Sequence, residues 1–284
     1  MPDPIYRAAT RDELNIGVEW ARKENWNPGY KDADGYWATD PSGFVCMEIS
    51  HEVVGFGSVV SFGGKFGFMG FYIVRPDYRG RGLGGPFWRW RKARLMARLD
   101  PGATIGMDGV PAMESFYGRG GFVTNHYNVR MSGKAASATP NPNIKDLALI
   151  SWDEILKLDQ QGFSTNRETL LRYWIDLPES FSFGYQSEGK LEGFGVIRPA
   201  SDGFRIGPLF AETANIAEKL LLSLCGAVSG ERVYVDMPDI NPEAIPMAKR
   251  LGMNEVSRCA RMYAGPPPDI PYDKTFAVAS LELG

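Results

Sequence analysis

The sequence predicts an α+β (mixed α/β) fold made of two tandem domains, each built from strands and helices. The first observation is the length, because 284 residues fit two domains of ordinary size. The second is a small, polar, proline-containing stretch, residues 132–145, which predicts a linker. The third is that residues 1–131 and 146–284 show the same order of helical and strand-like patterns, which predicts a duplication.

Composition excludes several classes of protein. The net charge of −3 argues against a nucleic-acid or membrane-surface protein, and no apolar run is long enough to span a membrane. The N-terminus lacks the apolar segment of a secretory signal. Three widely spaced cysteines suggest reduced thiols, so we expect a cytoplasmic protein. Only two histidines occur, and no metal-ligand spacing is present, so we expect no metal site.

The elements of the first domain follow from its apolar pattern. An apolar stretch at residues 5–9 precedes Thr10 and Glu13, which form a capping box at the start of a helix. Leu14, Val18 and Ala21 continue that helix at helical spacing. Later patterns predict strands at 43–50, 53–62, 66–75 and 104–108, with a helix at about 85–98.

The second domain repeats this order. An apolar stretch, residues 147–150, precedes Ser151 and Glu154, which we interpret as a second capping box. Strands are predicted at 182–186, 193–198, 204–210 and 232–236, with a helix at about 212–225. The last strand of each series ends in an aspartate, Asp108 or Asp236.

The segment from Val74 to Arg98 carries the strongest functional signal. It joins a strand to a helix through a loop with four glycines, Gly80, Gly82, Gly84 and Gly85. Without a Cβ, glycine lets backbone N–H groups approach a ligand closely, and the helix N-terminus adds free donors and a positive dipole end. The segment therefore predicts an anion site that suits a pyrophosphate.

The local charge agrees with that prediction. Residues 75–98 contain eight basic residues and one acidic residue in a chain that is acidic overall. The resulting positive field suits a polyphosphate-like ligand, although a solvated basic helix face has the same composition.

Two other phosphate motifs fit less well. Residues 80–85 match G-x-G-x-x-G, but the loop follows a meander of strands, and the acidic residue of a dinucleotide site is not clearly placed. A dinucleotide-dependent oxidoreductase is therefore a weaker alternative. The loop also lacks the Gly-Lys-Ser/Thr ending of a P-loop, which disfavours nucleoside triphosphates.

Two motifs resemble those of the GNAT superfamily of N-acetyltransferases. Arg79-x-x-Gly82-x-Gly84 resembles the family's Gln/Arg-x-x-Gly-x-Gly/Ala signature, and residues 112–122 resemble its A-x-x-(L/F)-Y-x-x-x-G-F segment. The resemblance covers about residues 5–130. The segment after Phe210 has no glycine or arginine, so the whole chain resembles tandem GNAT proteins with a degenerate second domain.

The resemblance implies that each domain is a curved mixed sheet with helices on both faces, and it implies an acetyl-CoA site and direct attack by an amine. Tyr117 would lie near the thioester sulfur and donate a proton to the leaving thiolate. Many members carry asparagine where this chain has Gly109, a departure that slightly favours a non-catalytic acyl-CoA-binding sensor as the alternative. The implied cofactor-binding residues are Ile73, Val74, Arg79, Gly80, Arg81, Gly82, Leu83, Gly84 and Tyr117.

The chemistry also needs a base. A lysine-like amine has a pKa of about 10.4, so most of it is protonated at neutral pH and cannot attack. Asp108, at a predicted strand end, and Glu24, after the first helix, are the candidate bases. The acceptor would be a small-molecule or peptide amine, and the sequence indicates neither which amine nor the oligomeric state.

Overall fold

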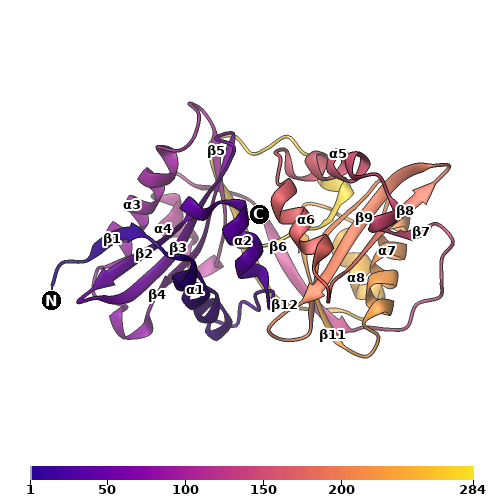
Figure 1. The fold of residues 1–284 in the computed structure, drawn as a ribbon, viewed down its shortest axis with the longest axis horizontal. Coiled ribbons are helices and arrows are strands. Elements are labelled where there is room, and N and C mark those ends of the chain that lie inside the picture. Colours follow the sequence, from indigo (N-terminus) through magenta and orange to yellow (C-terminus); the bar gives the residue numbers. More distant parts are fainter. Residues whose placement is uncertain (1) are drawn as a thin grey trace.

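The structure is a computed structural model that describes residues 2–284, and it consists of two halves side by side (Figure 1). The elements of the first half are β1 (Ile5–Ala8), α1 (Arg11–Lys23), α2 (Asp32–Thr39), β2 (Phe44–Ile49), β3 (Glu52–Phe62), β4 (Phe66–Val74), α3 (Gly84–Met96), β5 (Thr104–Gly109), α4 (Glu114–Gly118) and β6 (Val123–Lys134). Those of the second half are β7 (Ile144–Asp146), α5 (Trp152–Phe163), α6 (Glu168–Asp176), β8 (Phe181–Ser187), β9 (Lys190–Pro199), β10 (Phe204–Ala211), α7 (Ala214–Ala227), β11 (Arg232–Pro238), α8 (Ala244–Arg250), β12 (Asn254–Ala264) and β13 (Thr275–Ala277).

One sheet runs through both halves. Within residues 2–284 it has 13 strands in the order β1-β2-β3-β4-β5-β12-β6-β11-β10-β9-β8-β7, with β13 paired to β10. The two halves exchange strands at its centre. β12 crosses into the first half and lies between β5 and β6, whereas β6 pairs with β11 of the second half. Because backbone hydrogen bonds join the halves, they form one continuous structure.

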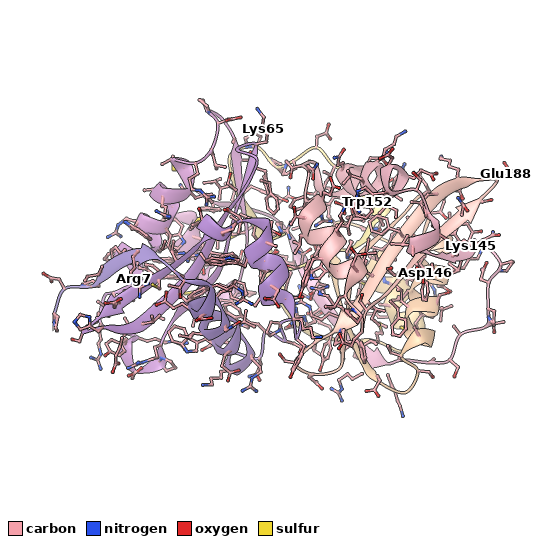
Figure 2. The ribbon with its side chains drawn as sticks, in the orientation of Figure 1. Arg7, Lys65, Lys145, Asp146, Trp152 and Glu188 are labelled. Carbon is pink, nitrogen blue, oxygen red and sulfur yellow. The ribbon has the colours of Figure 1, made fainter. Side chains whose placement is uncertain are left out.

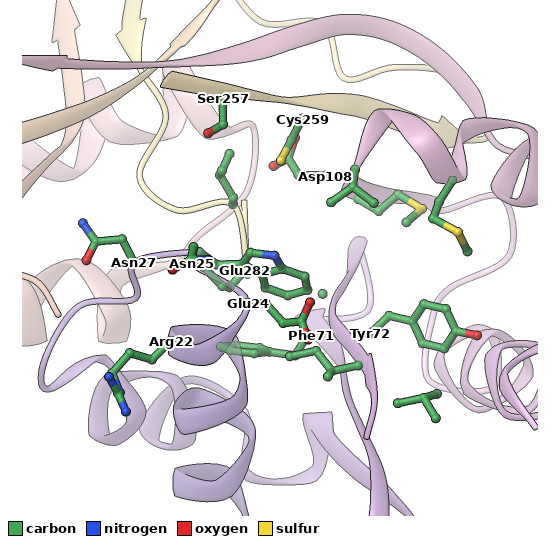
Figure 3. Close-up of a pocket in the computed structure, with 18 of the residues that line it drawn as sticks. Arg22, Glu24, Asn25, Asn27, Phe71, Tyr72, Asp108, Ser257, Cys259 and Glu282 are labelled. Carbon is green, nitrogen blue, oxygen red and sulfur yellow. The ribbon is translucent and has the colours of Figure 1, made fainter. Parts of the chain in front are cut away.

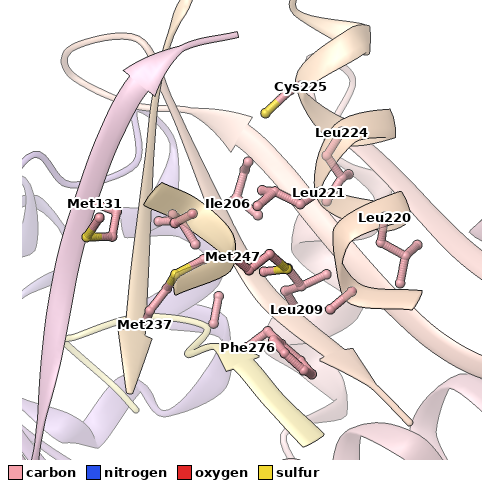
Figure 4. Close-up of a cluster of buried hydrophobic side chains, with 14 of the residues drawn as sticks. Met131, Ile206, Leu209, Leu220, Leu221, Leu224, Cys225, Met237, Met247 and Phe276 are labelled. Atoms are coloured by element: carbon pink, nitrogen blue, oxygen red, sulfur yellow. The ribbon is translucent and has the colours of Figure 1, made fainter. Parts of the chain in front are cut away.

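Helices cover both faces of the sheet in each half. In the first half, Leu14 of α1 and Tyr36 of α2 pack on one face, and Phe87 and Trp88 of α3 pack on the other. In the second half α7 and α8 cover one face, where Leu220, Leu221 and Leu224 meet Met247 and Phe276 (Figure 4). Helices α5 and α6 cover the opposite face.

The chain returns to the seam between the halves after β13. Val278 donates its N–H to Asp236 O at 2.9 Å, and Ser280 Oγ accepts hydrogen bonds from the N–H groups of Glu282 and Leu283. Arg167 Nη1 holds Gly284 O at 3.1 Å. Figure 1 shows the C-terminus between the two halves. This course places residues 278–284 against the sheet of the first half.

Most predicted elements are present within two residues of their expected ends. The Thr10–Glu13 capping box is confirmed, with both reciprocal hydrogen bonds made. The Ser151–Glu154 box is wrong: Ser151 precedes α5, but its side chain accepts no capping bond. Ser151 is exposed, so water competes for its hydroxyl. Residues 147–149 form a 3-10 turn rather than the counterpart of β1.

The predicted linker begins and ends in strands. Its first residues, Ser132–Lys134, continue β6, and its last two, Ile144 and Lys145, begin β7. The stretch between them runs along the outside of the second half. Charged turns such as those at Lys65 and Glu188 project from the two halves (Figure 2). Within the described residues, no helix has the length and apolar character to cross a membrane.

Candidate active site

The candidate site begins where two parallel strands separate. β4 and β5 pair from Phe66–Thr104 to Met69–Met107, and beyond Met69 the strands diverge. There β4 also carries a bulge: Phe71 and Tyr72 together oppose the single residue Gly57 of β3, and Phe71 has a φ of 50°. A bulge bends its strand and disrupts the ladder. Beyond Met69, β4 is therefore not paired with β5, and a ligand can lie along this edge of the strand.

The glycine loop lies at the end of this open edge. Residues 75–83 connect β4 to α3, and Gly80 and Gly82 have φ angles of 72° and 76°. A Cβ at either glycine would meet nothing within 4 Å, so the space beside the loop is open. Leu83, the N-cap of α3, makes no side-chain capping bond. The first amides of α3 are therefore free to bind an anion.

A cavity of about 1120 Å³ joins the loop, the notch between β4 and β5, and the second half. Figure 3 shows its walls, with Glu24, Phe71 and Glu282 facing Asp108 and Cys259 across the space. Most of the predicted site residues line it; they are Glu24, Ile73, Val74, Arg79, Gly80, Gly82, Leu83, Gly84, Asp108 and Tyr117. Arg81 is exposed instead, with its guanidinium 5.1 Å from the ring centre of Tyr78.

Tyr117 lies in α4 beside the notch and is 4% exposed. Its ring contacts Trp88 and Tyr72, and burial raises the pKa of its hydroxyl above the usual range, so the hydroxyl is protonated at neutral pH. A Cβ on Gly109 would lie 2.7 Å from that ring. Glycine at position 109 thus makes room for Tyr117, which gives the departure from the family pattern a packing reason.

Asp108 is held by residues far away in the sequence. Arg261 of β12 makes a two-pronged ion pair with it, at 2.6 and 2.9 Å, and Asn128 Nδ2 donates at 2.8 Å. Burial raises the pKa of Asp108, and the nearby Arg261 charge opposes that effect. Both oxygens of this carboxylate therefore already have strong donors.

Glu24 is the C-cap residue of α1 and forms an ion pair with Arg79 in the cavity wall. Arg79 Nε also donates to Val74 O at 2.7 Å. A predicted base and a predicted cofactor residue are thus in direct contact, and the arginine is anchored to the open strand.

A third carboxylate of the cavity, that of Glu282, was not among the residues predicted from the sequence. It lines the cavity but is 3% exposed, and its partners lie at longer distances: Tyr36 Oη at 3.2 Å and Arg205 Nη1 at 3.3 Å. The same Tyr36 hydroxyl lies 3.0 Å from Asp32, and its one proton serves only one carboxylate at a time. No local motif marks Glu282, because only the return of residues 278–284 brings it to the site.

A buried ionic network lies at the seam beside the site, and Arg130 links it to the cavity wall. Arg130 and Arg205 both bind Asp236, and Arg198 binds Asp32 at 2.9 Å. Burial opposes the charge on Asp236, but the two arginines hold its pKa well below the usual range. Removing one partner of such a buried ion pair strongly destabilises the folded protein, because the remaining charge stays buried without its partner. The network therefore locks both halves around the cavity.

The corresponding notch in the second half is filled. β10 and β11 pair in parallel from Phe204–Val233 to Ile206–Val235, and β13 then pairs with β10 where the strands diverge. A Cβ on Gly207 would collide with Val278 O. Only residues 212 and 213 connect β10 to α7, and Thr213 Oγ1 caps the helix by accepting from Ile216 N.

A sheet with a splayed parallel strand pair, a glycine-rich loop at a helix N-terminus and a tyrosine beside the notch defines a GNAT-type acyltransferase fold. Family models described as acetyltransferase (GNAT) family and acetyltransferase (GNAT) domain match residues 5–94 and 155–277. Holothin acyltransferase from Pseudoalteromonas sp. (strain SANK 73390) is 31% identical over 280 residues, covering 98% of this chain and 94% of that protein. The chain belongs to the GNAT family of acyltransferases. This assignment replaces the alternative of a dinucleotide-dependent oxidoreductase.

Solved structures share the fold over both halves. The crystal structure of a protein from Pyrococcus horikoshii superposes with a TM-score of 0.84 at 21% identity, covering 99% of this chain and 96% of that one. A tandem GNAT protein from the clavulanic acid biosynthesis pathway superposes with a TM-score of 0.65 at 13% identity, covering 94% and 100%. These likenesses show that the chain has a tandem GNAT fold.

Proposed function

We propose that this protein transfers an acyl group, acetyl in the first instance, from acyl-CoA to the primary amine of a small molecule or peptide. The observation that carries the proposal is a single cavity that joins the glycine loop, the open edge of β4 and buried carboxylates from both halves. The free thiols of Cys46, Cys225 and Cys259 are consistent with the cytoplasmic location that we expect.

The glycine loop would hold the pyrophosphate of the donor. The amides of residues 81–84 lead into the uncapped start of α3, and the open space beside Gly80 and Gly82 leaves room for phosphate oxygens. The backbone of Ile73 and Val74 would pair with the pantetheine arm as an added strand would. The thioester then lies at the bulge, between β4 and Tyr117.

Glu282 is our proposed base. Asp108 is bound at 2.6–2.9 Å by Arg261 and Asn128, whereas the contacts of Glu282 are 3.2 Å or longer. A carboxylate with weaker partners is freer to take a proton from the acceptor ammonium. Asp108 and Glu24, the bases predicted from sequence, remain the alternatives.

Tyr117 would protonate the thiolate that leaves when the amine attacks the thioester carbon. We expect Tyr117→Phe to lower kcat about a hundredfold, because a positioned proton donor is lost, while the Kd for acyl-CoA changes little. Stopped-flow or steady-state thiol release with a fixed amine gives kcat, and calorimetry gives Kd. An unchanged kcat would remove Tyr117 from the mechanism.

Thermal unfolding with acetyl-CoA, free CoA and NADH in separate titrations tests the donor. A ligand at 100 times its Kd adds about 2.7 kcal/mol, which moves the midpoint by several degrees. Longer acyl-CoA esters in the same assay test the acyl group. No response to any CoA species would contradict the proposal.

Thiol release in the presence of amines tests the acceptor. Holothin is the first acceptor to try, because the 31% identical relative is a holothin acyltransferase. Amino acids, polyamines and short peptides complete the panel. Binding of acyl-CoA without turnover of any amine would favour the non-catalytic acyl-CoA sensor.

A further inference from the structure

Arg91 of α3 is a buried guanidinium without an ion-pair partner in the described chain. It is 1% exposed, and no carboxylate of residues 2–284 lies within 4 Å of it. Its Nε and Nη1 atoms have no hydrogen-bond partner among those residues. Burial lowers the pKa of Arg91 to about 10, so the group stays cationic at neutral pH. A buried unpaired charge is costly, and such a cost points to a functional role.

The guanidinium is fastened to the bulge of β4. Its Nη2 atom donates to Gly70 O at 2.6 Å and to Ser58 O at 2.8 Å, and these two residues form the last strand pair before the bulge. Gly57, which opposes the bulge, leaves the space that the guanidinium occupies: a Cβ there would collide with Arg91 Nε. The arginine therefore fixes the point at which β4 turns away from β5.

The opposite face of the same strand is fixed by the second half. A Cβ on Gly70 would collide with Glu282 O, and Ser58 Oγ accepts from Gly70 N at 2.9 Å. The strand is thus held between Arg91 on one face and residues 280–284 on the other, so the bulge has little freedom to move.

The charge of Arg91 also reaches the reacting end of the notch. The guanidinium carbon lies 5.2 Å from the ring centre of Tyr72, one of the two bulge residues. Its positive charge opposes the burial that raises the pKa values of Tyr72 and Tyr117, and both tyrosines line the cavity. A fixed cation in a water-poor region acts strongly on developing negative charge.

We propose that Arg91 is a positioning residue for acyl transfer: it holds the β4 bulge in place and supplies the positive field that polarises the thioester carbonyl. This inference rests on the proposed function. The charge acts through the bulge backbone and Tyr117, without touching the donor. A guanidinium that served only to pack α3 on the sheet would leave the carbonyl unaffected.

Infrared difference spectra of bound [1-13C]acetyl-CoA test the proposal without an acceptor. In the wild-type protein we expect binding to lower the carbonyl stretching frequency. Arg91→Met should remove roughly half or more of that shift, because the positive charge is lost. Arg91→Lys should keep part of the shift, because lysine retains the charge but not the planar, forked set of N–H donors. Arg94→Met, one turn along α3 and partly exposed, is the matched control and should give the wild-type shift.

Each other outcome has a defined meaning. An equal shift in wild type and Arg91→Met overturns the role of Arg91, as does a wild-type complex with no shift. Failure of the wild type to bind acetyl-CoA overturns the proposed function itself. If Arg91→Met does not fold, Gly57→Ala is the second variant, because its added methyl group displaces the guanidinium of Arg91 without removing its charge. An unchanged carbonyl shift in Gly57→Ala overturns the proposal.

Discussion

The two halves of this molecule have the same architecture, but only one has an open ligand notch. In both, a parallel strand pair separates after three or four residue pairs, next to a bulge. In the first half the notch opens into a large cavity, whereas in the second half β13 occupies it. The GNAT fold therefore provides the notch, and the segments around it decide whether a ligand can enter.

The loops that follow the notch also differ between the halves, in their length and in whether the next helix is capped. Nine residues, 75–83, connect β4 to α3, and they leave the helix start uncapped. Two residues connect β10 to α7, and Thr213 caps that helix with its own side chain. Free amides at a helix start attract an anion, whereas capped amides have a partner already.

The largest expected effect on ligand binding, its complete loss, tests whether binding belongs to the first half alone. Gly82→Glu places a negative side chain in the open space beside the loop, at a φ of 76°. We expect the stabilisation by acetyl-CoA, about 2.7 kcal/mol at 100 Kd, to vanish in thermal titrations.

Gly230→Glu is the matched control for that variant. Gly230 also has a positive φ, 93°, with nothing within 4 Å of a Cβ, but it lies between α7 and β11 in the second half. Gly230→Glu should lower the stability of the ligand-free protein about as much as Gly82→Glu does, and it should keep the stabilisation by acetyl-CoA. Loss of the response in both variants would show that the second half takes part in binding.

What the sequence could predict depended on how local each signal was. The loop, its glycines and α3 were predictable, because glycine spacing and a helix start act within a few residues. The capping of α1 by Thr10 was predictable for the same reason. The partner of Asp108 was not, since Arg261 lies 153 residues away on an exchanged strand. Glu282 and β13 carry no motif, and only tertiary pairing places them.

The next expected effect concerns the two strand-end aspartates, which have opposite environments. Asp236 is bound by two arginines that hold its pKa low, whereas burial raises the pKa of Asp108 despite Arg261. Asp236→Asn leaves Arg130 and Arg205 without this carboxylate, and we expect it to cost about 3 kcal/mol of unfolding free energy in urea titrations at pH 7. Asp108→Asn should cost less.

The pH dependence of stability separates these two aspartates further. A lowered folded-state pKa means that Asp236 contributes stability above its unfolded pKa of about 3.9, which is lost as the pH falls toward the folded value. The folded-state pKa of Asp108 is raised instead. Ionisation of Asp108 therefore lowers the stability as the pH rises from the unfolded pKa toward the folded-state pKa. Asp236→Asn should therefore flatten the acid-side loss of stability, and Asp108→Asn should flatten the loss on raising pH. The same pH slope in both variants would contradict the assigned environments.

A third prediction concerns the C-terminal segment, residues 275–284, which fills the notch of the second half and brings Glu282 to the cavity of the first half. Residues 275–277 fill the second notch, and Glu282 follows in the cavity of the first. We expect Glu282→Gln to lower kcat/KM for the amine about a hundredfold at pH 7, the effect of losing a general base. Because a neutral amine needs no base, much of the rate should return at high pH, where the acceptor is deprotonated.

Glu24→Gln and Asp108→Asn complete that test. If either gives the larger loss with recovery at high pH, the base is the sequence-predicted carboxylate and not Glu282. The Kd for acetyl-CoA should stay within a few-fold in all three, which separates loss of the base from loss of the donor site.

The smallest expected effect compares two capping threonines, one in each half. Thr213 accepts from Ile216 N at 3.3 Å, and Thr10 accepts from Glu13 N at 3.2 Å. Replacing either by alanine should cost about 1 kcal/mol of unfolding free energy, because one amide at a helix start loses its partner. The added stabilisation by acetyl-CoA should be the same as in the wild type for both. If Thr213→Ala instead strengthens that stabilisation, the uncapped α7 has become an anion site, and capping rather than β13 is what closes the second half to ligand.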